Sequence, residues 1–286
     1  MLTLGLIGRG AWARIIGATL DSLPELRWVP LSGPGVSVDG VIIANRSKDH
    51  VSSALPFVEA GVPCFIEKPV ATSLEDFLRL KAAADASGSH VFAGHLHRFN
   101  PAAEAFCAAL SEIGEVQSAT AFCANGKPRD DTSVIWDWLP HPLSLAARIF
   151  GTPADGATAR SLEGGARPLR VAAQLSYEGR VFDLEASWLS PEPAFRITAT
   201  GTGGRLILDD KAVQKVTLMR DGESVALVHD PELPLTREIR AFVDLIRGVR
   251  DNPSPLDAAE DVLRSLDAIE RSAAAEGAPV AINWPV

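Results

Sequence analysis

The chain has 286 residues, of which 47% are hydrophobic, so it is long enough to form two domains with their own cores. Its 27 basic and 36 acidic residues give a net charge of −9, which argues against nucleic acid or an anionic membrane surface as its partner. No stretch reaches the ~18 apolar residues of a membrane span, and no basic leader precedes the first strand-like residues, so we expect a cytoplasmic protein.

The first residues predict a strand, a glycine-rich turn and a helix. The apolar run from Leu4 to Ile7 leads into Gly8-Arg9-Gly10-Ala11-Trp12-Ala13, and apolar residues follow at helical spacing. This order matches the dinucleotide-binding fingerprint, with alanine in its third position. Glycines at positions 8 and 10 let the backbone approach a pyrophosphate, whose charge is favoured at the helix amino terminus.

The region after the second predicted strand, residues 26–31, is abbreviated. The fingerprint expects an acidic residue there to hold the ribose 2′-hydroxyl, but Ser32 and Gly33 follow the strand. Residues 34–38 are too few for the usual helix and strand, and residues 39–44 already predict the next buried strand. The choice between NAD and NADP stays open. Arg9, Arg46 and Lys48 could meet a 2′-phosphate, which slightly favours NADP, or all three could be solvated surface charges.

A buried parallel strand is predicted over residues 62–66, and it ends in Glu67-Lys68-Pro69. Ligands bind at the carboxyl edge of an open α/β sheet, so Lys68 is placed for chemistry, although a solvated Glu-Lys pair would give the same pattern. Helical patterns over residues 49–60 and 72–87 and a strand over residues 90–94 continue the alternation. This alternation predicts a Rossmann-type, doubly wound parallel sheet in an α/β domain of residues 1–115.

From about Val116 the pattern changes to consecutive strands joined by turns, which predicts a largely antiparallel open sheet in a second, α+β domain of residues 116–286. One helix, predicted over residues 136–150, interrupts the strands, and two further helices are predicted over residues 236–249 and 255–275. The cysteines Cys64, Cys107 and Cys123 are widely spaced and odd in number, so we expect reduced structural thiols and no metal site.

Asp137 and His141 are four residues apart, so on one helix they would share a face near its amino terminus. A carboxylate beside an imidazole, facing a lysine from the first domain, suits hydride transfer from a secondary alcohol, because one group removes the hydroxyl proton while others position the oxygen. The alternative is a structural role, with Asp137 favoured by the helix dipole and His141 held by a hydrogen bond.

Together these motifs resemble the Gfo/Idh/MocA family, named after glucose-fructose oxidoreductase, inositol dehydrogenase and rhizopine catabolism proteins, over nearly the whole chain. The resemblance implies that Lys68, Asp137 and His141 are catalytic, with His141 as the proton acceptor, and that His97 and Arg98 border the substrate; Arg98 could instead be an ion-pair residue between the domains. It also implies a cis Lys68–Pro69 peptide bond and a homo-oligomer, a dimer or tetramer, formed through the open face of the second sheet. The predicted cofactor-binding residues are Gly8, Arg9, Gly10, Ala11, Trp12, Ser32, Asn45, Arg46, His50, Glu67 and Lys68.

We therefore expect an NAD(P)-dependent dehydrogenase or reductase that acts on a secondary alcohol or ketone of a sugar, inositol or related polyol. One alternative is a non-catalytic NAD(P)-binding regulator of the same fold, and another is a nucleotide-sugar keto-reductase. Two departures from the family pattern bear on specificity. The link between Ser32 and Asp39 is short, and Ser144 stands where many relatives carry a second acid three residues after the histidine.

Overall fold

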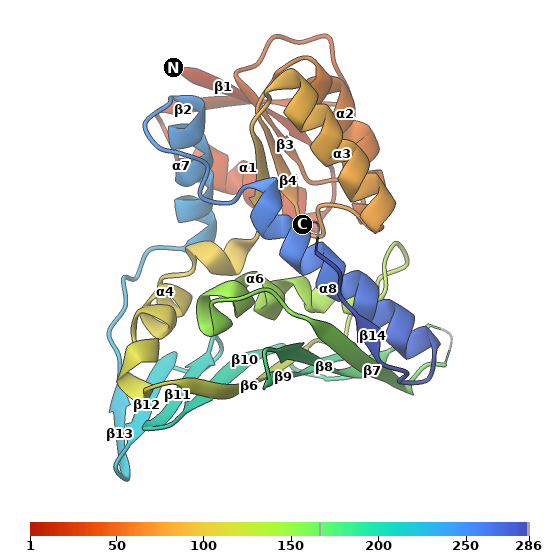
Figure 1. Cartoon of the computed structure of the whole chain (residues 1–286). Coiled ribbons are helices and arrows are strands. Elements are labelled where there is room, and N and C mark those ends of the chain that lie inside the picture. Colours follow the sequence, from red (N-terminus) through yellow and green to blue (C-terminus); the bar gives the residue numbers. More distant parts are fainter. Residues whose placement is uncertain (166, 285–286) are drawn as a thin grey trace. The chain divides into compact units, whose positions relative to one another are not determined.

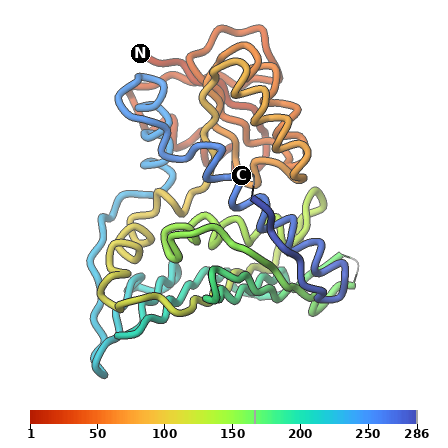
Figure 2. Tube along the Cα trace, in the orientation of Figure 1, coloured from red at the N-terminus to blue at the C-terminus, as the bar shows by residue number. Residues whose placement is uncertain are grey.

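The computed structural model describes residues 1–165 and 167–284. The chain forms two compact units: unit 1 comprises Met1–Phe99 and Glu232–Leu263, and unit 2 comprises Asn100–Pro231 and Arg264–Val286. Figures 1 and 2 follow the chain from red at the amino terminus to blue at the carboxyl terminus. Within the described ranges, no helix combines the length and the apolar character that crossing a bilayer requires.

Unit 1 is built on a five-stranded sheet in the order β2-β1-β3-β4-β5, with every neighbouring pair parallel. Its strands are β1 (Leu2–Ile7), β2 (Leu26–Leu31), β3 (Gly40–Ile43), β4 (Cys64–Glu67) and β5 (Val91–Gly94). Its helices are α1 (Ala11–Asp21), α2 (His50–Glu59), α3 (Leu74–Ser87) and α7 (Pro234–Ile246), with short 3₁₀ turns η1 (Ser47–Asp49) and η2 (Leu96–Phe99). All residues of β3, β4 and β5 are buried, as in a sheet covered on both faces. The predicted doubly wound parallel sheet is confirmed.

Helix α7 lies late in the chain but packs on the sheet of unit 1. Its Phe242 ring meets Phe65 and Phe92 edge-on, with centroids 5.8 and 5.7 Å apart. A Cβ added to Gly40, at the start of β3, would lie 2.6 Å from Ile246 Cδ1. Residues 32–39 hold no helix, and α7 packs with α1 in one apolar core against β3, β4 and β5. Unit 1 therefore differs from the range 1–115 by this returning segment and by ending its first part at Phe99.

Unit 2 is built on a nine-stranded sheet in the order β13-β12-β11-β10-β6-β9-β8-β7-β14. Neighbouring strands are antiparallel except β6 and β9, which are parallel. The strands are β6 (Val116–Ala124), β7 (Gly156–Glu163), β8 (Arg170–Tyr177), β9 (Arg180–Ser187), β10 (Ala194–Gly201), β11 (Gly204–Asp209), β12 (Val216–Arg220), β13 (Glu223–Ala226) and β14 (Val280–Ala281). The predicted largely antiparallel second sheet is confirmed, and β7, β13 and β14 extend it beyond the predicted strands.

Unit 2 contains the helices α4 (Pro101–Ala108), α5 (Val134–Trp138) and α6 (Pro140–Phe150) and the 3₁₀ turn η3 (Leu110–Ile113). Helix α8 (Leu256–Ala274) begins in unit 1 and ends in unit 2. The single helix predicted over residues 136–150 is thus two helices, because Pro140 and Pro142 lack the N–H groups that would continue the hydrogen bonds of α5. The expectation that Asp137 and His141 share one helix is wrong: Asp137 lies on α5 and His141 on α6.

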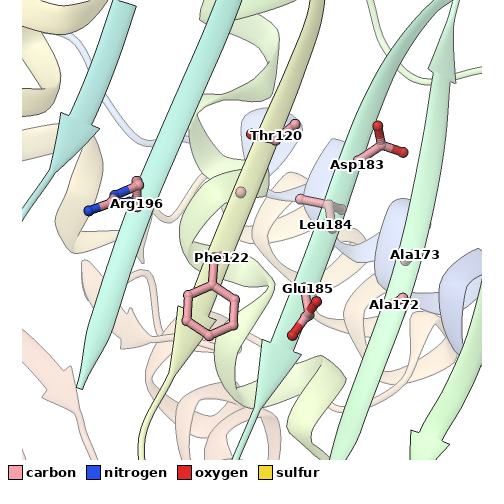
Figure 3. A pocket seen from close by; sticks show the side chains of 9 residues that line it. Thr120, Phe122, Ala172, Ala173, Asp183, Leu184, Glu185 and Arg196 are labelled. Carbon is pink, nitrogen blue, oxygen red and sulfur yellow. The ribbon is translucent and has the colours of Figure 1, made fainter. Parts of the chain in front are cut away.

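The two faces of the sheet in unit 2 differ. Helices α4, α5 and α6 pack on one face (Figure 1). The opposite face carries a shallow hollow, where Phe122 of β6 lies between Arg196 of β10 and Glu185 of β9 (Figure 3). These three residues are direct partners in the strand register. Phe122 keeps 38% of its surface exposed, so an apolar ring stands in the middle of a charged row.

Candidate active site

The glycine-rich turn joins β1 to α1. Gly8 has a φ of 153°, and a Cβ there would lie 2.4 Å from the carbonyl oxygen of Ala44, so only glycine fits. Gly10 caps α1 without a side-chain hydrogen bond, no acidic residue lies in the first helical turn, and a Cβ at Gly10 would meet no atom within 4 Å. The amino terminus of α1 therefore offers N–H groups and open space, which suits a pyrophosphate.

A buried carboxylate ties this turn to the end of β4. Trp12 Nε1–H donates to Glu67 Oε1 at 2.6 Å, and the backbone N–H of Lys68 donates to Glu67 Oε2 at 3.2 Å. The Lys68–Pro69 peptide bond is cis, as the resemblance implied. His50, buried at the start of α2, places Nδ1 2.8 Å from the carbonyl oxygen of Pro69. The loop that carries Lys68 is thus held from both α1 and α2.

Other predicted cofactor residues lie at the same carboxyl edge of the parallel sheet. Exposed Ser32 follows β2, and Asn45 and exposed Arg46 follow β3. Asn45 Nδ2 donates to Ser53 Oγ at 2.8 Å, while its buried Oδ1 has no hydrogen-bond partner among the described residues. Asp39, the acid nearest to the end of β2, accepts from the backbone N–H of Thr3 at 2.7 Å, at the opposite end of the sheet. At the end of β2, where the dinucleotide fingerprint has an acidic residue for the ribose, this chain therefore has Ser32.

The segment after β5 holds two predicted substrate residues and one that the sequence did not single out. His97 is buried, and Arg98 Nη2 donates to the carbonyl oxygen of Pro253 at 3.2 Å within unit 1. His95 is also buried, and neither ring nitrogen has a partner among the described residues. Burial, and then the positive charges of Arg98 and Lys68, lower the pKa of His95 to about 3. His95 is therefore a neutral imidazole near Lys68.

In unit 2, Asp137 is buried and oriented by two donors that sequence reasoning missed. Trp188 Nε1–H, just after β9, donates to Asp137 Oδ2 at 2.9 Å. Arg129 Nη1 lies 3.5 Å from Asp137 Oδ1, and the same guanidinium makes two 3.0 Å hydrogen bonds to Asp131. Although burial opposes its charge, the carboxylates of Asp131 and Asp137 raise the pKa of Arg129. Both oxygens of Asp137 are thereby fixed in one orientation.

His141 is half-buried at the start of α6 and lies among aromatic rings. Its ring centroid is 5.5 Å from that of Trp138 and 6.2 Å from that of Phe195. Ser144, one turn later, donates its hydroxyl to the carbonyl oxygen of His141 at 2.7 Å. Unit 2 thus supplies an oriented carboxylate and an imidazole on successive helices, whereas Lys68 belongs to unit 1.

Comparisons with known proteins agree in fold and in chemical class. A family model described as an oxidoreductase family with an NAD-binding Rossmann fold matches residues 23–95. The chain is 27% identical over 259 residues to D-xylose 1-dehydrogenase (NADP(+)) 2 of Haloferax volcanii, covering 83% of this chain and 78% of that protein. A shorter match, 34% identical over 77 residues, to inositol 2-dehydrogenase of Paracoccus denitrificans covers 27% of this chain and 23% of that protein.

A solved structure of a provisionally assigned oxidoreductase from Magnetospirillum magnetotacticum MS-1 is similar over most of the chain. It superposes with a TM-score of 0.84 at 28% sequence identity, covering 93% of this chain and 99% of that chain. The likeness therefore includes both units.

Proposed function

We propose that this chain, which belongs to the Gfo/Idh/MocA family of oxidoreductases, is an NAD(P)-dependent dehydrogenase or reductase acting on a secondary alcohol or ketone of a sugar, inositol or related polyol. The observation that carries the proposal is the fixed end of β4. Glu67 holds Lys68 beside the uncapped amino terminus of α1, at the sheet edge where α/β proteins bind ligands.

The residues of unit 1 fit a nicotinamide dinucleotide. Gly8 and Gly10 allow close approach to the amino terminus of α1, and Ser32, Asn45 and Arg46 line the same edge toward the adenosine end. Bound there, the nicotinamide would accept or donate the hydride. Asn45 Oδ1 lacks a partner among the described residues and can accept a hydrogen bond from a cofactor hydroxyl.

We assign the transfer of the substrate proton and the positioning of the substrate oxygen to Lys68, Asp137 and His141. An unprotonated ring nitrogen of His141 takes the proton of the substrate hydroxyl and returns it in the reverse direction. The Lys68 ammonium donates a hydrogen bond to the same oxygen and stabilises negative charge on it. Asp137, whose oxygens already accept from Trp188 and Arg129, orients the substrate and is not the proton acceptor. The convergence of these groups from two units is part of the proposal.

The proposed cofactor is NADP in slight preference to NAD. Residues 32–38 contain no acidic side chain that could hold a free 2′-hydroxyl or repel a 2′-phosphate, and Asp39 is engaged at the other end of the sheet. Arg9, Arg46 and Lys48 are exposed near this edge and can pair with a phosphate. The D-xylose dehydrogenase relative is itself named for NADP(+).

The proposed substrate is rich in hydroxyl groups. Around Asp137, the buried polar atoms Thr132 Oγ1, Trp136 Nε1 and Trp138 Nε1 have no hydrogen-bond partner within the described part of the chain. A polyol or sugar can satisfy such groups, and the Trp138 ring beside His141 offers an apolar surface for the C–H groups of a sugar. In this division of labour, unit 1 binds the cofactor, and unit 2 binds substrate and mediates self-association.

Fluorescence titration with NADH and with NADPH tests the first half of the proposal, and turnover with a panel of pentoses, hexoses, inositols and UDP-sugars tests the second. We expect NADPH to bind in the micromolar range, about tenfold more tightly than NADH, and at least one unphosphorylated polyol to turn over. Cofactor binding without any turnover would identify a regulator. Failure of both cofactors to bind below about 1 mM would refute the proposal.

A further inference from the structure

Trp12, in the first turn of α1, is a large aromatic residue that the fold of unit 1 leaves partly exposed. The residues through which α1 joins the apolar core of unit 1 are Ala13, Ile16 and Leu20. Trp12 is not among them and keeps 37% of its surface exposed. The ring lies just after Gly10, at the helix end that we propose for the pyrophosphate, so a bound cofactor and not the core is in a position to cover it.

Although it is exposed, the Trp12 ring is held in one orientation. Its Nε1–H donates to Glu67 Oε1 at 2.6 Å, and Glu67 is itself buried at the end of β4. The other carboxyl oxygen of Glu67 accepts from the backbone N–H of Lys68 at 3.2 Å. The indole and the start of the Lys68 loop are thus attached to the same carboxyl group. A ring that is already fixed loses little conformational freedom when a ligand covers it, which favours binding.

The ring reaches toward one end of the proposed cofactor site. In the sheet order β2-β1-β3-β4-β5, β2 lies on one side of β1 and β4 on the other. Ser32, at the end of β2, marks the adenosine end of the cofactor, and the pyrophosphate lies at α1, which follows β1. The indole of Trp12 reaches Glu67, at the end of β4. It therefore lies on the side away from the adenosine, where the nicotinamide half of a dinucleotide and Lys68 belong.

We infer that the indole of Trp12 stacks on the nicotinamide ring of the cofactor and holds that ring beside Lys68. The inference rests on the proposed function, because it takes the turn at Gly8 and Gly10 to be the cofactor site. Flat aromatic rings favour offset stacking, and the electron-rich face of an indole attracts the positively charged ring of an oxidised nicotinamide. Trp12 therefore adds affinity for the nicotinamide half of the cofactor and none for the adenosine half.

Calorimetric titration with NADPH, NADP⁺ and 2′-phospho-ADP-ribose tests the inference, because the last ligand lacks only the nicotinamide. We expect Trp12→Ala to weaken the binding of NADPH and NADP⁺ about tenfold and to leave 2′-phospho-ADP-ribose within about twofold of wild type. Trp12→Leu keeps apolar bulk without a flat ring and should give the same result; it serves if the alanine variant does not fold. Ile15→Ala, which removes an exposed side chain from the same helix, should bind all three ligands as wild type does.

A second measurement is the charge-transfer absorption band of an indole stacked on oxidised nicotinamide, which wild type with NADP⁺ should show and Trp12→Ala should lack. If the Trp12 variants weaken NADPH and 2′-phospho-ADP-ribose equally, Trp12 only supports the turn and the inference is overturned. Unchanged NADPH affinity in both variants overturns it too. If wild type prefers NADH, NAD⁺ and ADP-ribose complete the series. If wild type binds none of these ligands, the proposed function fails and the inference falls with it.

Discussion

Among single side chains, Asp137 shows how the fold fixes the orientation of a buried carboxylate. A buried carboxylate needs donors, and Asp137 finds Trp188 from the end of β9 and Arg129 from the loop after β6. The guanidinium of Arg129 is in turn held by two hydrogen bonds to Asp131. This chain of contacts fixes the direction of the Asp137 carboxylate, which we propose orients the substrate, and it lies entirely within unit 2.

Trp188→Phe should therefore impair catalysis while sparing the fold. The substitution keeps a buried ring but removes the indole donor to Asp137, and a lost hydrogen bond to a charged acceptor costs roughly 1.5–3 kcal/mol. We expect kcat/KM to fall about tenfold to a hundredfold in steady-state assays, with NADPH affinity unchanged. Trp28→Phe is a matched control, because Trp28 Nε1 donates to Asp21 Oδ1 at 2.8 Å in an exposed hydrogen bond of unit 1. Equal losses in both variants would argue against a role for Trp188.

Glu238, a fully buried acid on α7, leads to a prediction about stability. Its pKa is raised by burial and by Glu67, so the neutral form favours folding at low pH, and that stability is lost as pH rises from the ordinary 4.5 through the raised value. Glu238→Gln should therefore melt at a higher temperature than wild type near neutral pH and at a similar temperature near the ordinary value. Thermal unfolding followed by circular dichroism checks this. If Glu238→Gln melts at a lower temperature than wild type at neutral pH, burial of the Glu238 carboxyl group does not destabilise the fold.

Among the secondary-structure elements, the glycine-rich turn contains one glycine that the fold itself requires and one that only the proposed ligand would require. Gly8 is required by the protein itself, since its φ is 153° and a Cβ would meet the backbone of Ala44. Gly10 has no such requirement, since a Cβ there meets no protein atom within 4 Å. The open space beside Gly10 is where the proposed pyrophosphate would lie.

Gly10→Ala and Gly8→Ala should consequently fail in different ways. Gly10→Ala should keep the wild-type melting temperature and lose about tenfold or more in NADPH affinity, because its methyl group would enter the space that we propose for the pyrophosphate. Gly8→Ala should lower the free energy of unfolding by about 1–3 kcal/mol, because the left-handed backbone and the close carbonyl oxygen are both unfavourable for alanine. Unchanged NADPH affinity in Gly10→Ala would show that the cofactor does not bind beside Gly10.

The sequence predicted those features that local patterns specify. The turn at Gly8, the strand that ends at Glu67, the parallel sheet and the change to consecutive strands near Val116 all follow from spacing and composition. The split of the predicted helix at Pro140 could have been predicted from the sequence, because proline lacks the backbone N–H that would continue a helix.

The long-range packing could not be predicted from the sequence pattern. The return of α7 to the first sheet depends on Phe242 meeting rings from β4 and β5. Trp188 reaches Asp137 across 51 residues, and no periodicity links two such positions. The complete burial of Glu238 is likewise a property of the fold, since in the sequence it resembles an ordinary acid on a helix.

For the molecule as a whole, we propose self-association through the hollowed face of the sheet in unit 2. Phe122 lies there between Arg196 and Glu185, and a second copy could bury this ring (Figure 3). Light scattering after size exclusion should show a dimer or tetramer for wild type and a smaller species for Phe122→Glu. Val213→Glu, at a fully exposed position, should leave the mass unchanged. A wild-type monomer at micromolar concentration would contradict this assembly.

In the proposed reaction, His141 accepts the substrate proton while the turn at Gly8 and Gly10 holds the cofactor. The most direct test of this proposal measures kcat and NADPH affinity together for wild type, His141→Asn and the exposed control His229→Asn. We predict that His141→Asn binds NADPH as wild type does but loses about 10²- to 10⁴-fold in kcat, and that His229→Asn matches wild type in both. A His141→Asn variant that turns over substrate at the wild-type rate would exclude His141 as the proton acceptor.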